Sequence, residues 1–157
     1  MRLEIMGVPP VRSNDFGIGG KMESCKILLI DDDPTYRAIM REAASSLGGV
    51  ELKAYGSLVE MGSVCCLGKY DVIIVDYDLG LISGNDIATY LESFFGSSIP
   101  MLLISSVPRN DRVKGTSLEH TDFTLKTENY SEVLQKAATL ASGSLVSKKT
   151  VEKFLSL

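Results

Sequence analysis

Four short apolar runs in this chain each end at a residue that can bind a metal ion or a phosphoryl group. The runs and the polar residues that follow them are 27–30 before Asp31, Asp32 and Asp33; 72–75 before Asp76; 101–104 before Ser105; and 123–125 before Lys126. Unbroken apolar runs of this length are typical of buried parallel strands, and an open α/β sheet gathers its site at the carboxyl ends of its strands. The pattern therefore predicts one acidic pocket with a hydroxyl and an ammonium group at its rim.

Length, charge and cysteine content exclude several classes of protein. A chain of 157 residues, 45% of them hydrophobic and 23% charged, is typical of one globular domain. The net charge of −4 argues against general binding to nucleic acid or anionic lipid. No apolar stretch approaches the roughly 20 residues that span a bilayer, and three cysteines without metal-ligand spacing indicate a reducing compartment. We therefore expect a cytoplasmic protein with neither nucleic-acid nor membrane partners.

Strand and helix patterns alternate from residue 26 onward. Residues 27–30, 71–76 and 101–104 are apolar nearly throughout, as central strands are, whereas residues 50–55 and 122–126 alternate as edge strands do. Strand order 2-1-3-4-5 fits this arrangement best. That order defines the flavodoxin-like doubly wound sheet, an α/β fold in which five parallel strands carry helices on both faces.

The expected helices follow from caps and apolar stripes. Asp33 and Pro34 suit the N-cap and the first position of a helix that ends before Gly48. A second helix is expected from Ser57 to about residue 67, although Gly62 weakens it. The remaining helical patterns cover residues 84–95, after a loop at 77–83, and residues 130–141.

The ends of the chain and one internal stretch fit the alternation less well. We expect residues 1–24 to form a flexible leader, residues 25–142 the domain, and residues 143–157 a short extra C-terminal helix. Residues 107–121 lack an apolar stripe, which favours a turn or loop over a full helix. A further hypothesis is that Met22 is the native start, since a purine-rich stretch can encode the residues before it.

The predicted pocket has a definite chemistry. The loops after strands one and three are neighbours in this strand order, so Asp31, Asp32 and Asp76 should converge. Two carboxylates about 4 Å apart repel by about 1 kcal/mol in water and by about 4 kcal/mol at an effective dielectric near 20. A hard cation with sparse protein ligation, such as Mg²⁺, offsets that repulsion, and Lys126 adds a fixed positive charge. The set suits phosphoryl transfer to Asp76 as nucleophile, with Lys126 and Ser105 contacting the phosphoryl oxygens.

Residues 26–141 resemble a response-regulator receiver domain, the phosphoacceptor module of two-component signalling. In that family an acidic pair follows strand one, the phosphorylated aspartate ends strand three, a Ser or Thr ends strand four, and a Lys ends strand five. The matching residues are Asp31 and Asp32, Asp76, Ser105 and Lys126. Each motif alone is common, but all four in order on the right strands make a specific signal.

The resemblance implies roles for three further residues. The family's metal-binding carbonyl lies two residues after the phosphoacceptor, which is Asp78 in this chain. An aromatic residue three positions before the Lys changes rotamer on activation in the family; Phe123 has that position, so Ser105 and Phe123 are the expected switch residues. The family's loop glycine, eight residues after the phosphoacceptor, corresponds to Gly84.

The chain departs from the family pattern at three places. Gly80 replaces a frequent proline, which predicts a looser loop after the phosphoacceptor. Thr127 follows the Lys where members usually have a proline joined through a cis bond. A cis bond before a residue other than proline costs roughly 3–4 kcal/mol, so we expect a trans bond there, a change that can displace the Lys126 ammonium. The third departure is the weak helical pattern at 107–121, on the family's output face.

The leading hypothesis is a signalling switch. A histidine kinase or phosphotransfer protein donates a phosphoryl group to Asp76 with Mg²⁺ present, and the change shifts the domain toward a form that binds a downstream protein. The chain would act alone, as a chemotaxis-type or phosphorelay regulator, or be a receiver cut from a longer protein. No enzyme activity beyond self-phosphorylation and self-dephosphorylation is expected.

Two alternatives remain open. Positions 80 and 127 and the weak helix motivate a phosphorylation-independent interaction module that keeps the fold. Asp76-Tyr77-Asp78 also resembles the nucleophile and acid pair of haloacid-dehalogenase-like phosphatases. In that class the pair follows the first strand and paired acids follow the Lys, so the order of motifs here argues against a phosphatase.

Overall fold

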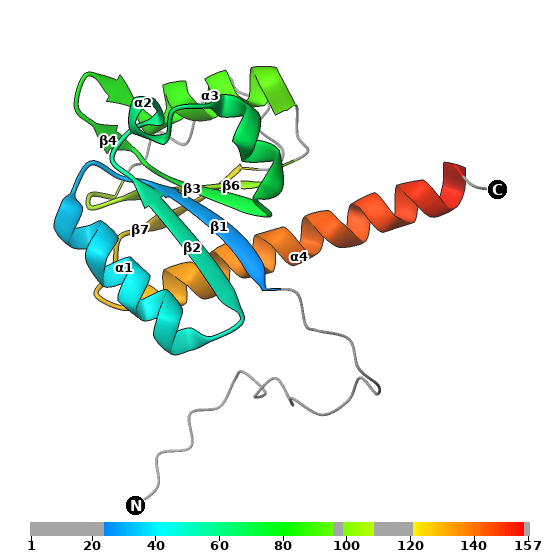
Figure 1. Cartoon of the computed structure of the whole chain (residues 1–157), viewed down its shortest axis with the longest axis horizontal. Helices are drawn as coiled ribbons and strands as arrows, with labels where there is room; N and C mark the ends of the chain where they lie inside the picture. Colours follow the sequence, from blue (N-terminus) through cyan, green and yellow to red (C-terminus); the bar gives the residue numbers. More distant parts are fainter. Residues whose placement is uncertain (1–23, 96–98, 109–120, 156–157) are drawn as a thin grey trace, which may run out of the picture.

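A computed structural model describes residues 24–95, 99–108 and 121–155, which form a five-stranded parallel sheet in the order β2-β1-β3-β6-β7 (Figure 1). Its strands are β1 (Cys25–Ile30), β2 (Val50–Tyr55), β3 (Val72–Asp76), β6 (Met101–Ser105) and β7 (Thr121–Leu125). Because β6 and β7 are the fourth and fifth strands of this sheet, the order is the predicted 2-1-3-4-5. Every residue of β3 and β6 is buried, whereas β2 and β7 each contain exposed residues among less exposed ones, which confirms the assignment of central and edge strands.

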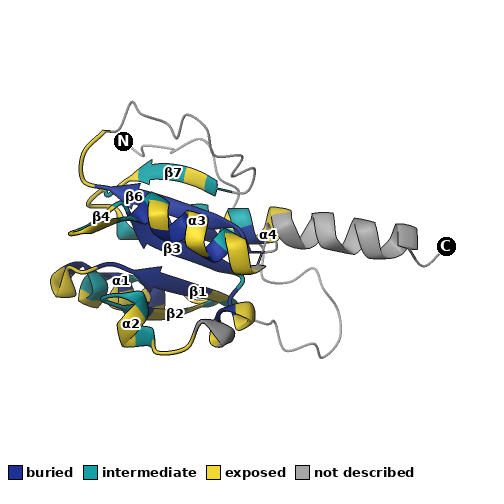
Figure 2. Cartoon of the chain, turned by 90° about the horizontal axis from the view of Figure 1, so that it is seen from above, coloured by how far each residue is buried: buried dark blue, intermediate teal, exposed yellow. Residues whose placement is uncertain are grey.

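Helices cover both faces of the sheet (Figure 2). Alternate residues of β1 point to opposite faces: Ile27 and Leu29 pack with α1 (Pro34–Leu47) and α4 (Tyr130–Leu155). Leu28 and Ile30 pack with the 3₁₀ helix η1 (Val64–Lys69) and with α3 (Gly84–Phe95). The sheet thus has one hydrophobic core on each face, and the loops at its carboxyl edge extend from this packed sheet.

The predicted helix from Ser57 to about residue 67 is wrong as one element. The chain forms a single turn, α2 (Leu58–Met61), and then the separate helix η1. Ser57 does cap α2, accepting a hydrogen bond from the Glu60 amide, but Gly62 has φ of 88° and ends the turn. A positive φ lies outside the α-helical region, so the helix cannot pass through this glycine.

The loop after β3 contains a short hairpin that the sequence pattern did not predict. Strands β4 (Asp78–Leu79) and β5 (Ile82–Ser83) pair antiparallel across a turn in which Gly80 has φ of 74°. A proline has φ fixed near −65°, so proline cannot adopt this conformation. Glycine at position 80 is therefore part of an ordered turn rather than a sign of a loose loop.

The C-terminal helix differs from the expectation of a separate short helix after residue 143. Helix α4 runs without interruption from Tyr130 to Leu155 and extends beyond the sheet (Figure 1). Gly143 lies inside it, because one glycine costs only about 1 kcal/mol relative to alanine and no proline is present to stop the helix. The doubtful stretch 107–121 lies largely outside the described residues. Within the described part of the chain, no helix is both long enough and apolar enough to span a membrane.

Candidate functional site

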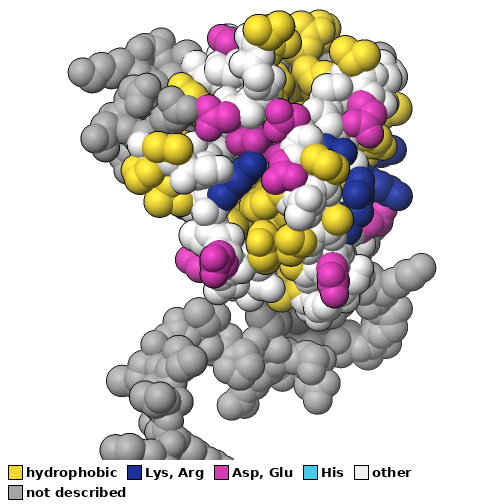
Figure 3. Space-filling view, turned by 90° about the vertical axis from the view of Figure 1, so that its left-hand side faces the viewer, with side chains coloured by type: hydrophobic (Ala, Val, Ile, Leu, Met, Phe, Trp, Pro, Cys, Tyr) yellow, Lys and Arg dark blue, Asp and Glu magenta, His cyan; other side chains and the backbone are white. Residues whose placement is uncertain are grey.

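The carboxyl edge of the sheet brings the predicted pocket residues together. Among the described residues, the buried polar side chains are Asp31, Asp76 and Ser105, which are 0%, 3% and 0% exposed. They end or follow β1, β3 and β6, which are adjacent strands. In Figure 3, which shows this end of the molecule, acidic side chains gather around a basic one. Burying polar groups costs free energy unless they are paired, so this cluster is the candidate functional site.

Lys126 lies between two of the carboxylates. Its Nζ is 2.7 Å from Asp31 Oδ2 and 2.8 Å from Asp76 Oδ2. The described residues contain no cis peptide bond, so the Lys126–Thr127 bond is trans as expected, yet the ammonium still reaches the pocket. Burial alone would lower the pKa of Lys126, but hydrogen bonds and charges from Asp31 and Asp76 outweigh it and raise the pKa.

The loop after β1 fixes the direction of Asp31. Its Oδ1 accepts a hydrogen bond of 2.9 Å from the Asp33 amide, and Arg37 Nη1 donates to the Asp31 carbonyl at 2.7 Å. Asp33 itself caps α1 by accepting a 2.8 Å hydrogen bond from the Thr35 amide, with Pro34 next to it at the start of the helix. The predicted cap thus also orients the first pocket carboxylate.

Three carboxylates form a candidate cation site. Asp31, Asp32 and Asp76 each offer an oxygen, and these atoms all lie within 4.8 Å of one another. Burial raises the pKa of Asp31, and repulsion from Asp76 adds to this, while Lys126 and the Asp33 amide act in the opposite direction. One ammonium cannot neutralise three carboxylates. Hard oxygen ligands with a residual negative charge fit Mg²⁺, which keeps several of its waters.

Asp78 contributes more than sequence reasoning assigned to it. Its backbone amide donates a 3.2 Å hydrogen bond to Asp76 Oδ1, which helps to fix the carboxylate. Its side chain also accepts a 3.3 Å hydrogen bond from Ser105 Oγ, while Ser105 Oγ accepts one of 3.2 Å from the Val107 amide. The hydroxyl at the end of β6 is therefore held at the pocket by two neighbouring loops.

Gly84 is required by a close approach of the backbone to Asp76. A Cβ added at position 84 would collide with the Asp76 carbonyl oxygen, and the Gly84 amide donates a 2.8 Å hydrogen bond to the Tyr77 carbonyl. Phe123, by contrast, lies farther along β7 and is half-buried against the core on the α3 side. Its carbonyl accepts a 3.1 Å hydrogen bond from Lys136 Nζ on α4.

Sequence reasoning missed Tyr36 as part of this site. The sequence pattern gave Tyr36 no role beyond its place in the first predicted helix, but its ring lies beneath Lys126 Nζ, 4.5 Å from the ring centroid. Burial, followed by the charge of Asp31, raises the pKa of the Tyr36 hydroxyl. An aromatic residue three positions after the helix cap Asp33 was the available signal, because the first turn of α1 borders the carboxyl edge.

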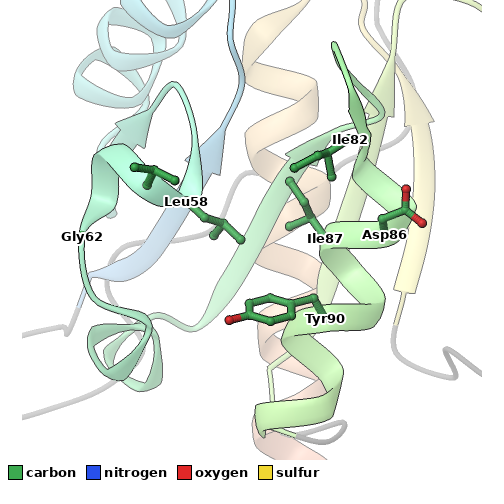
Figure 4. Close-up of a pocket in the computed structure, with 7 residues that line it drawn as sticks. Leu58, Gly62, Ile82, Asp86, Ile87 and Tyr90 are labelled. Atoms are coloured by element: carbon green, nitrogen blue, oxygen red, sulfur yellow. The ribbon is translucent and has the colours of Figure 1, made fainter.

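An apolar hollow of about 550 Å³ lies away from these residues, between α2 and α3 (Figure 4). Leu58, Ile87 and Tyr90 are among its lining residues, and Asp86 is the one charged side chain among them. Asp86 accepts a 2.8 Å hydrogen bond from Ser83 Oγ at the start of α3. The hollow offers apolar contact surface, whereas the clustered titratable groups of the described residues lie at the sheet edge.

Comparison with known proteins identifies the family of this chain. The sequence model described as "Response regulator receiver domain" matches residues 27–138. The chain is 29% identical over 116 residues to the "Probable transcriptional regulatory protein SilR" of Salmonella typhimurium, and the match covers 73% of this chain and 50% of that protein. The chain thus spans half the length of this curated relative.

Solved structures share the fold. Chemotaxis protein CheY4 of Vibrio cholerae matches with a TM-score of 0.63 at 17% identity, over 74% of this chain and 98% of that chain. Response regulator TrrA of Thermotoga maritima, solved in complex with Mg²⁺ and BeF, matches with a TM-score of 0.61 at 23% identity, over 73% and 97%. A CheY-like receiver domain from Methanospirillum hungatei gives 0.65 at 12% identity, over 79% and 98%. With residues 27–138 matching the family model, this chain belongs to the response regulator receiver domain family.

Proposed function

We propose that this chain is a phosphoacceptor switch whose phosphorylated residue is Asp76. The observation that carries the proposal is the placement of a buried aspartate at the end of β3, with Lys126 Nζ 2.8 Å from its Oδ2 and two further carboxylates beside it. A carboxylate held by an ammonium beside a candidate cation site has what phosphoryl transfer needs: a nucleophile and positive charge for the equatorial oxygens.

The transfer follows from the positions of these groups. An oxygen of Asp76 forms a bond to phosphorus while the P–N bond of a donor phosphohistidine breaks, and the imidazole nitrogen keeps the bonding electron pair. Lys126 stabilises the charge on the transferred group, and Ser105 turns its hydroxyl from Asp78 toward a phosphoryl oxygen. Asp31, Asp32, Asp76 and the Asp78 carbonyl would hold Mg²⁺, which when bound neutralises charge on the phosphoryl oxygens.

The consequence of phosphorylation is a shift between two conformations. Ser105 and Phe123 are the residues that register the phosphoryl group, and the shifted form binds a downstream protein. The donor is a histidine kinase or a phosphotransfer protein, the phosphoryl group is later lost by self-hydrolysis, and the compartment is the cytoplasm. Family membership and the acidic pocket support this proposal.

A phosphorylation assay tests the proposal directly. The protein is incubated with acetyl phosphate and Mg²⁺, and its intact mass is measured by mass spectrometry. The wild type and an Asp122→Asn control, changed at an exposed residue of β7, should gain one phosphoryl group, and Asp76→Asn should gain none. A wild type that stays unmodified would favour the phosphorylation-independent interaction module. Turnover of p-nitrophenyl phosphate would favour a phosphatase instead.

A further inference from the structure

Among the described residues, Lys126 contacts two carboxylates and one aromatic ring. Besides Asp31 and Asp76, its ammonium lies over the ring of Tyr36, with Nζ 4.5 Å from the ring centroid. A cation within about 6 Å of an aromatic face is attracted by the ring quadrupole, and the attraction grows when water is excluded. Tyr36 is only 7% exposed, so this contact lies in a largely dry environment.

The ring of Tyr36 also packs against a second aromatic ring. Tyr130, the first residue of α4, packs against it with ring centroids 5.7 Å apart and planes inclined by 58°. The Tyr36 hydroxyl has no hydrogen-bond partner among the described residues, although it is buried. Within the described part of the chain, Tyr36 contacts the pocket lysine through the face of its ring.

The ring contact differs from the two ion pairs in one respect. Asp31 and Asp76 are also the groups that would bind a cation and, for Asp76, accept the phosphoryl group, so each of these carboxylates would gain a partner that competes with Lys126. An aromatic face does not bind Mg²⁺ in competition with carboxylate oxygens. The contact with Tyr36 is therefore the one that Lys126 can keep throughout.

We propose that Tyr36 is a positioning residue, which holds the Lys126 ammonium at the pocket through its aromatic face when a cation occupies the neighbouring carboxylates. This inference rests on the proposed function for its effect on phosphorylation. The contact itself exists independently of any phosphoryl donor. The effect of Tyr36 on the Lys126 side chain and its effect on the rate of phosphorylation are therefore measured in separate experiments.

The first experiment measures the contact without a phosphodonor. Ring currents of Tyr36 should shift the side-chain methylene resonances of Lys126 upfield in NMR spectra, both without and with saturating Mg²⁺. Tyr36→Phe should keep the shift, and Tyr36→Leu should abolish it and make the Lys126 side chain mobile once Mg²⁺ is added. A Lys126 side chain that is equally ordered in Tyr36→Leu with Mg²⁺ would overturn the proposal.

The second experiment measures the rate of phosphorylation by acetyl phosphate in variants that keep the ring's shape. Tyr36→Phe should react like the wild type. Replacement of Tyr36 by pentafluorophenylalanine, which has the same outline but a reversed quadrupole, should slow the reaction about three- to tenfold, as should Tyr36→Leu. Equal rates for phenylalanine and pentafluorophenylalanine would contradict an electrostatic role.

A matched control exists within the chain. Tyr70 is also buried and also lies under a lysine, with Lys69 Nζ 5.4 Å from its ring centroid, but it precedes β3 at the opposite end of the strand from Asp76. Pentafluorophenylalanine at position 70 should leave the phosphorylation rate unchanged. If the wild type takes up no phosphate, the proposed function fails, while the NMR result with Mg²⁺ still decides whether Tyr36 holds Lys126.

Discussion

Lys126 Nζ lies 2.8 Å from Asp76 Oδ2, although 50 residues separate the two in the sequence. The contact joins the ends of β7 and β3, two strands that do not pair with each other, across β6. A second carboxylate oxygen, from Asp31, lies 2.7 Å from the same ammonium. The single lysine therefore links three strand ends, and its removal should affect both stability and chemistry.

Replacing Lys126 by methionine should destabilise the protein, because two buried carboxylates lose their counter-charge. Removing one partner of a buried ion pair costs about 3 kcal/mol, and urea unfolding at neutral pH without metal measures it. Saturating Mg²⁺ should restore part of the loss, since a cation binds the folded state preferentially. Lys136→Met is the control: its ion pair with Asp122 is longer, at 3.5 Å, and both side chains are exposed by more than a third. A similar loss in both variants would argue against a special role for Lys126.

The acidic pocket should give the metal-free protein an unusual dependence on pH. Because the pKa of Asp31 is raised above the ordinary value of 3.8, mainly by burial, the folded protein binds this proton more tightly than the unfolded chain. The contribution of Asp31 to the free energy of unfolding therefore falls as pH rises from about 3.8 through the folded-state pKa.

Asp31→Asn isolates that contribution. The variant should be more stable than the wild type at pH 7 without metal, and the difference should shrink toward pH 4, when measured by urea unfolding at each pH. It should also bind Mg²⁺ far more weakly in a calorimetric titration. A variant that is less stable than the wild type at pH 7 would mean that the ion pair with Lys126 outweighs the burial of the carboxylate.

Replacing Gly84 and Gly143 by alanine should change the stability of the protein in opposite directions. Gly84→Ala places a methyl group against the Asp76 carbonyl and should destabilise the protein by about 1–3 kcal/mol. Gly143 lies within α4, and a Cβ added there would meet no atom of the described residues within 4 Å other than its chain neighbours and the nearby helix backbone, so Gly143→Ala should stabilise the protein by up to about 1 kcal/mol. Thermal unfolding of both variants checks the pair. A neutral Gly84→Ala would show that the backbone after β3 can move away from α3.

The Tyr36 hydroxyl, which has no hydrogen-bond partner within the described ranges, predicts the effect of two substitutions on the melting temperature. A buried polar atom without a hydrogen bond costs about 1–3 kcal/mol, and its removal is neutral or stabilising. Tyr36→Phe should therefore have the melting temperature of the wild type or a higher one. Tyr36→Leu leaves space beside Tyr130 and should melt at a lower temperature. A clearly destabilised Tyr36→Phe would show that the hydroxyl has a partner after all.

The strand order and the pocket were predictable because both follow from short-range patterns. Apolar runs identify central strands, and parallel strands place the residues after them at one edge, so Asp31, Asp76 and Ser105 converge without knowledge of side-chain packing. The helix cap at Asp33 was predictable for the same reason, since it depends on neighbouring residues alone.

The remaining features depend on contacts between distant segments. Tyr36 looks like any core residue of α1 until β7 brings Lys126 over its ring. Glycine interrupts a helical sequence pattern both at position 62 and at position 143, but only Gly62 ends a helix. Gly62 has a positive φ, whereas α4 continues through Gly143. Whether a helix ends at a glycine depends on packing against distant segments, and a sequence pattern alone does not contain that information.

Asp76 can be identified chemically as the phosphorylated residue. After reaction with acetyl phosphate and Mg²⁺, reduction with borohydride converts an aspartyl phosphate to homoserine, and peptide sequencing by mass spectrometry finds its position. Homoserine is expected at position 76, dependent on Mg²⁺ and strongly reduced in Lys126→Met. Homoserine at Asp31 or Asp32 instead, or at no position, would contradict it.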